Sequence, residues 1–126
     1  MAKDKLMALG LAEPVPLPQD LAAQYATAKE RLGFVPNVLR GYAHAPDRLA
    51  NFVAMRDGLM ASDSGLTKAE REMIAVVVSS LNRCHYCLTS HGATLRRLTG
   101  DPPLADTLAM NFRAAGLPDR QRAMLE

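Results

Sequence analysis

A helix-start signal stands directly before the most apolar run of the chain. In Leu66-Thr-Lys-Ala-Glu70 the Thr67 hydroxyl can accept from the amide of Glu70 while the Glu70 carboxylate accepts from the amide of Thr67, which is the capping-box pattern. The following run from Met73 to Leu81 contains three consecutive valines, and alone it would also suit a buried strand. Because a capping box precedes the run and no partner strand is signalled elsewhere, we expect a helix at the centre of the core.

The other apolar segments also repeat at helical spacing. The expected helices run from Gln19 to a cap at Gly33, from Pro36 to about Ala43, from Pro46 to about Met60, over 83–98 with Asn82 as N-cap, over 104–115, and over 117–126. The predicted fold class is therefore all-α, a bundle of about six or seven helices.

Prolines organise the N-terminal segment differently. Pro14, Pro16 and Pro18 occupy alternate positions, which favours an extended arm. We therefore predict a Pro-rich arm over 1–18 and one helical domain over 19–126. A chain of 126 residues can bury a core, and oligomerisation would add to its stability.

Charge and hydropathy exclude several classes of protein. The net charge is +2, with both signs interspersed along the chain, so neither nucleic acid nor an anionic membrane is expected as a partner. No apolar run approaches the length of a membrane span. The charged residues at the N-terminus are not followed by the apolar core of a signal peptide, which predicts a cytoplasmic protein.

The two cysteines of the chain lie within eight residues, C84-H-Y-C-L-T-S-H91. Cytoplasmic thiols are kept reduced, and a disulfide across two intervening residues closes too small a loop to stabilise much. The pair is therefore expected to be catalytic, redox-sensing or metal-binding rather than a structural staple.

Helical register brings three of these side chains together. With Cys84 in the first turn of a helix, Cys87 and His91 follow at i+3 and i+7 on the same face. A helix N-terminus favours thiolate over thiol, and a nearby histidine supplies a base or a cation. His85 is expected to point to solvent or to a subunit interface, and Tyr86 is a candidate pocket residue.

A carboxylate behind His91 would complete a proton relay, and Glu72 is the candidate. Glu70 is expected to be used by the capping box. In one unbroken helix Glu72 would lie about 18 Å along the axis from Cys84, so its participation requires a sharp turn at Asn82-Arg83.

Two other kinds of site use the same residues. Cys84, Cys87, His85 and His91 could supply four zinc ligands, although the second ligand cluster of structural zinc sites is missing from the sequence. Alternatively, the pair belongs to a non-enzymatic redox sensor or an oligomeric binding module that oxidises once and shifts its assembly. A thioredoxin-like site is disfavoured because no βαβ pattern surrounds the cysteines.

The spacing of these residues resembles a known signature. Glu72, eleven residues, and then Cys84-x-Tyr-Cys87-x-x-x-His91 is similar to the signature of the alkylhydroperoxidase D (AhpD-like) family in the carboxymuconolactone decarboxylase superfamily. Gly33-Phe-Val-Pro-Asn is similar to the opening of the peroxidase-related branch of that family. The resemblance covers roughly residues 30 to 126.

The resemblance implies a thiol peroxidase. Cys87 would attack a hydroperoxide, Cys84 would resolve the sulfenic acid as a disulfide, and Glu72 with His91 would relay the proton. No metal or organic cofactor is implied, and the cysteine pair argues against decarboxylation.

Other implications concern partners and chain length. All-α protomers of this family form trimers or hexamers, and a dithiol restores the cysteines, from a lipoyl-bearing protein in some members. The best-studied members carry a histidine at the position of Tyr86, so this chain departs from them there. Chains of the branch generally continue beyond the position of Glu126, which predicts a truncated C-terminus.

Overall fold

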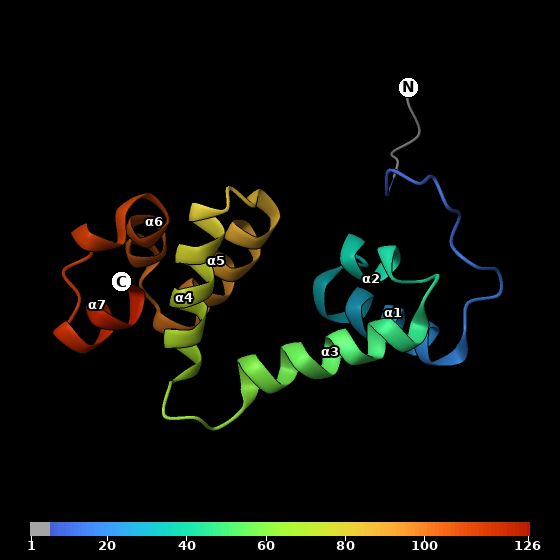
Figure 1. The fold of residues 1–126 in the computed structure, drawn as a ribbon, viewed down its shortest axis with the longest axis horizontal. Coiled ribbons are helices and arrows are strands. Elements are labelled where there is room, and N and C mark those ends of the chain that lie inside the picture. The colour runs from blue at the N-terminus through green and yellow to red at the C-terminus, as the bar shows by residue number, and fades with distance from the viewer. Residues whose placement is uncertain (1–5) are drawn as a thin grey trace. The chain divides into compact units, whose positions relative to one another are not determined.

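The computed structural model of the protein describes residues 6–126, and this part of the chain is helical without a strand (Figure 1). The helices are α1 (Gln19–Leu32), α2 (Asn37–Gly41), α3 (Pro46–Ala61), α4 (Lys68–Leu81), α5 (His85–Thr99), α6 (Pro102–Asn111), the short 3-10 helix η1 (Phe112–Ala114) and α7 (Asp119–Leu125). The predicted all-α fold class is confirmed. Within 6–126, no helix combines the length and the apolar character that crossing a membrane requires.

The chain divides into two compact units, and the boundary falls inside α3, between Asp57 and Gly58. Residues 6–18 contain no helix or strand, and residues 1–5 of the expected arm lie outside the described part. The division into an arm over 1–18 and one helical domain over 19–126 stays a prediction.

The N-terminal unit has its own small core. It is made by α1, α2 and the first part of α3, and the ring of Tyr42 stacks on Phe52 with centroids 5.4 Å apart. The buried apolar side chains are Leu21, Leu39, Ala43 and Leu49. Each fully buried leucine contributes about 1.5–3 kcal/mol relative to an exposed one, and partly buried side chains such as Leu17 and Val53 pack against this core.

The C-terminal unit is built around α4, which packs against α5, α6 and α7 (Figure 1). Its core consists of Met73, Val76, Val77, Leu95, Ala105, Leu108 and Phe112. The predicted capping box is confirmed, because the Glu70 amide donates to Thr67 Oγ1 at 3.1 Å and the Thr67 amide donates to Glu70 Oε2 at 2.8 Å. The apolar run after the box is therefore a core helix and not a strand.

Three predicted helix starts are wrong by about two residues, and one of them is that of α7, which begins at Asp119 instead of residue 117. Asn82 has φ −77° and ψ −5°, which is helical, so it closes α4 instead of capping the next helix, and the N-cap of α5 is Cys84. The next helix, α6, begins at Pro102 because the Asp101 side chain caps the amide of Leu104 and proline suits a first turn.

A cluster of polar side chains ties the segment before α1 to α1 and α2. The Tyr25 hydroxyl donates to Glu13 Oε1 at 2.8 Å, and Arg40 donates to Glu13 Oε2 through Nη2 at 2.8 Å and Nε at 3.1 Å. The hydrogen bonds from Arg40 hold the pKa of Glu13 below its ordinary value. Burial, with the hydrogen bond to Glu13, raises the pKa of Tyr25.

We expect Glu13→Gln to lower the free energy of unfolding at pH 7 by about 0.5–1 kcal/mol, since the ion pair is lost while the side chain can still accept hydrogen bonds. Because the pKa of Glu13 is lower in the folded protein than in the unfolded chain, its ionisation stabilises the fold at pH values above the unfolded pKa, which is about 4.3 for glutamate. This stabilisation is lost as the pH falls through the folded pKa. The difference between wild type and variant should therefore shrink below about pH 4 in urea titrations. Glu30→Gln, at an exposed position of α1, is the matched control and should show neither effect.

Candidate functional site

The site depends on the chain reversal between α4 and α5. The Arg83 amide donates to the Ser80 carbonyl at 3.0 Å, and the Cys84 amide donates to the Ser79 carbonyl at 2.9 Å. Arg83 has φ 53°, so the turn is a Schellman motif with Arg83 in the left-handed position. The sharp turn predicted at Asn82-Arg83 is present, and α5 begins directly after it.

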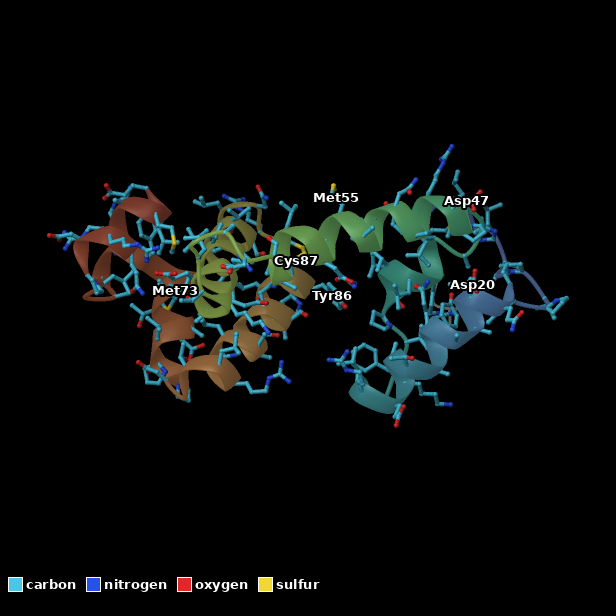
Figure 2. All side chains as sticks on the ribbon, turned by 90° about the horizontal axis from the view of Figure 1, so that it is seen from below. Asp20, Asp47, Met55, Met73, Tyr86 and Cys87 are labelled. Atoms are coloured by element: carbon cyan, nitrogen blue, oxygen red, sulfur yellow. A yellow bond between two sulfur atoms is a disulfide. The ribbon has the colours of Figure 1, made fainter. Side chains whose placement is uncertain are left out.

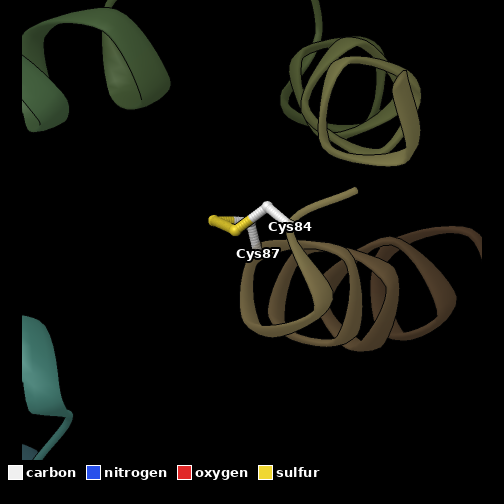
Figure 3. Close-up of a disulfide and its surroundings, with 2 residues drawn as sticks. All are labelled: Cys84 and Cys87. Atoms are coloured by element: carbon white, nitrogen blue, oxygen red, sulfur yellow. A yellow bond between two sulfur atoms is a disulfide. The ribbon is translucent and has the colours of Figure 1, made fainter. Parts of the chain in front are cut away.

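Cys84 and Cys87 form a disulfide at the start of α5, with their Cα atoms 5.4 Å apart (Figure 3). The spacing predicts Cys84 in the first turn of the helix, but Cys84 is the N-cap, and Cys87 is the third residue of the helix. The first amides of a helix have no partner within it, and the helix dipole is positive at this end. After reduction, this position favours a thiolate.

Glu72 and His91 meet across the turn. His91 Nδ1 lies 2.7 Å from Glu72 Oε2, and the two residues come from α4 and α5. The Glu72 side chain is 13% exposed and that of His91 is 34% exposed, so the contact is partly sheltered from solvent. Because the carboxylate engages Nδ1, Nε2 is the nitrogen that can exchange a proton with a bound molecule.

The other candidates lie at the edge of the disulfide. His85 is exposed, and the neighbouring Tyr86 is 50% exposed beside Cys87 in the first turn of α5 (Figure 2). His91 follows Cys87 by four residues, one helical turn. Within residues 6–126 no group of three or more His, Cys, Asp or Glu side chains is placed to hold a metal ion.

One ion pair at the start of α4 was not predicted from the sequence. The buried Glu70 carboxylate, besides closing the capping box, pairs with Arg120 of α7, and Arg120 also donates to the Gly65 carbonyl at 3.0 Å. The backbone hydrogen bond from Thr67, together with Arg120, lowers the pKa of Glu70 although burial opposes the shift. Glu70 therefore anchors the start of α4, two residues before Glu72.

Known proteins are similar to the chain over most of its length. The sequence profile of the carboxymuconolactone decarboxylase family matches residues 46–125. An uncharacterized peroxidase-related protein from Silicibacter sp. TM1040, with 49% identity and a TM-score of 0.89, aligns with 99% of this chain and 65% of its own. Another from Ralstonia eutropha JMP134, described as an alkylhydroperoxidase AhpD core, has 45% identity and a TM-score of 0.82 over 91% of this chain and 62% of its own.

The chain thus spans slightly less than two thirds of each of these two solved proteins. No match was found among curated proteins.

A double-mutant cycle of Glu72→Ala and His91→Ala measures the contact independently of any activity. We expect a coupling energy of about 1 kcal/mol in urea unfolding of the disulfide form, as for a hydrogen bond with a charged partner that is partly buried. The matched cycle of Glu72→Ala with His85→Ala should give a coupling within about 0.5 kcal/mol of zero. Equal coupling in the two cycles would show that the contact does not stabilise the protein.

Proposed function

Because the chain belongs to the carboxymuconolactone decarboxylase family and its solved relatives are peroxidase-related, AhpD-like proteins, we propose that it is a thiol-dependent peroxidase that reduces hydroperoxides. The observation that carries the proposal is the Cys84–Cys87 disulfide at a helix N-terminus, on the helix whose His91 contacts Glu72. A redox pair, a site that favours thiolate and a histidine–carboxylate pair are the parts that such a reaction needs.

The first step of the proposed reaction uses the reduced pair. The Cys87 thiolate attacks the peroxide, the O–O bond breaks, and Cys87 becomes a sulfenic acid. The leaving alkoxide takes a proton from the His91 imidazolium and departs as the alcohol. Glu72 stabilises that imidazolium and orients the ring through Nδ1.

The second step closes the disulfide. The Cys84 sulfur attacks the sulfenic sulfur of Cys87, and the hydroxyl leaves as water. A dithiol then returns two electrons and two protons to the pair and becomes a disulfide itself. One hydroperoxide and one dithiol are thus converted into one alcohol, one water and one oxidised dithiol.

Cys87 is assigned as the attacking thiol because it lies one turn before His91, although the N-cap position would also acidify Cys84. The proposed setting is a cytoplasmic homo-oligomer, a trimer or hexamer, with a dithiol reductant such as a lipoyl-bearing protein. Assembly is supported by exposed apolar side chains of the C-terminal unit, of which Leu81 is 76% and Met110 is 88% exposed.

Removing either sulfur should separate the two chemical roles. We expect Cys87→Ser to abolish consumption of a hydroperoxide in the presence of excess dithiol, because the attacking sulfur is lost. Cys84→Ser should leave a sulfenic acid at Cys87 that a dimedone-type probe traps and mass spectrometry locates. Turnover unaffected by both changes would falsify the proposal, and a single oxidation of the wild type without turnover would indicate the redox sensor instead.

Substituting Glu72 or His91 should slow the reduction of hydroperoxide while the Cys84–Cys87 pair stays in place. We expect Glu72→Gln and His91→Gln each to lower the rate of hydroperoxide consumption by about 10²–10⁴-fold, the usual contribution of a general acid or base. The control is His85→Gln, a histidine of the same eight residues at an exposed position, which should keep the wild-type rate. Thiol titration before and after dithiol treatment checks that the disulfide still forms and is still reducible in each variant.

A further inference from the structure

Arg83 occupies a backbone conformation that other helix ends of this protein give to glycine. Within residues 6–126 it is the only residue other than glycine with a positive φ, 53°. The left-handed residues that close α1 and α5 are Gly33, with φ 80°, and Gly100, with φ 67°. A side chain in this region opposes folding, since its Cβ crowds the following carbonyl oxygen, and glycine avoids that cost.

The Arg83 side chain is exposed and directly precedes Cys84 of the disulfide. The ion pairs formed among residues 6–126 do not include Arg83. Its backbone hydrogen bonds in the turn would form equally well with glycine. Arginine at this position therefore combines a strained backbone with an exposed cation on the residue that directly precedes Cys84, and strain of this kind concentrates at functional sites.

We propose that Arg83 is a specificity-determining residue that binds an anionic group of the dithiol that reduces the disulfide. The inference rests on the proposed function and names the chemistry of its reductant. Arg83 directly precedes Cys84, whereas His91 lies one turn beyond Cys87, so along the chain the arginine is on the Cys84 side of the pair and the histidine is on the Cys87 side. A carboxylate carried by the reductant can contact the guanidinium while its thiolate reaches the disulfide.

This placement selects one sulfur as the target. The reductant thiolate attacks Cys84 Sγ, the disulfide bond breaks, and its electron pair leaves on Cys87 Sγ within the first turn of α5. The second thiol of the reductant then attacks the mixed disulfide and releases the Cys84 thiolate, so the reductant leaves as a disulfide. Cys87, the proposed peroxide nucleophile, is thus regenerated in the first of the two exchanges.

The test compares two dithiols that differ only in charge. Rates of reduction of the oxidised wild-type chain are measured with dihydrolipoate, which ends in a carboxylate, and with dihydrolipoamide, which ends in a neutral amide. Two lipoyl-lysine peptides, flanked by aspartates or by asparagines, form a second pair that represents a protein-borne reductant. A preference within the first pair identifies a small carboxylate dithiol, and one within the second pair identifies an acidic carrier; either supports the proposal if it depends on Arg83.

We expect Arg83→Gln and Arg83→Gly to reduce the preference for the anionic dithiol by about two- to five-fold, the usual effect of one exposed ion pair. Arg83→Lys should keep most of the preference, and high salt should remove it from the wild type. Arg83→Gly should also unfold at a higher temperature, because glycine relieves the strain. Arg97→Gln, an exposed arginine later on α5, is the control and should leave the preference unchanged.

Three results would overturn the inference. An unchanged preference in Arg83→Gln would show that the guanidinium does not contact the reductant. Equal slowing with the charged and neutral dithiols would show that Arg83 acts on the leaving thiolate instead. A wild type that reduces hydroperoxides with no preference in either pair would refute the role of Arg83 and leave the proposed function intact, whereas loss of hydroperoxide turnover itself would refute the proposed function.

Discussion

The two backbone hydrogen bonds that reverse the chain between α4 and α5 are the constraint on which the site depends. They stop α4 at the residue that allows Glu72 to contact His91, nineteen positions later in the sequence. Each helical residue turns the side-chain direction by about 100°, so one residue more or less before the turn would point Glu72 away from α5. The same reversal places Cys84 at the N-cap of α5, directly before the first helical residue, His85.

The packing of the C-terminal unit keeps this arrangement in register. Val76 of α4 and Leu95 of α5 are completely buried, and the capping box with Arg120 anchors the start of α4. Close-packed side chains of this kind resist small shifts between helices. The disulfide, in contrast, lies at a helix end, so its opening and closing involve the turn and the first residues of α5 without rearranging the core.

Local sequence signals were enough to predict the helices, the capping box, the turn after α4 and the spacing of Cys87 and His91 by one helical turn. The same signals gave the wrong role for Asn82, which closes α4 instead of starting α5. Asparagine is favoured both at N-caps and near helix C-termini, and only the packed structure decides between the two. No local pattern signals the left-handed conformation of Arg83, where glycine is usual. The pairing of Glu70 with Arg120, fifty residues away, depends on tertiary packing that spacing along the chain does not report.

The main chain and the side chain of Cys84 have different tasks. Its main-chain amide satisfies the Ser79 carbonyl and so completes the end of α4, while its side chain supplies the sulfur. Almost any amino acid retains that amide, and proline alone lacks it. The sulfur at this position can therefore be gained, lost or exchanged for oxygen during evolution without altering the bend, so the fold can persist in relatives that lack the redox function proposed for this chain.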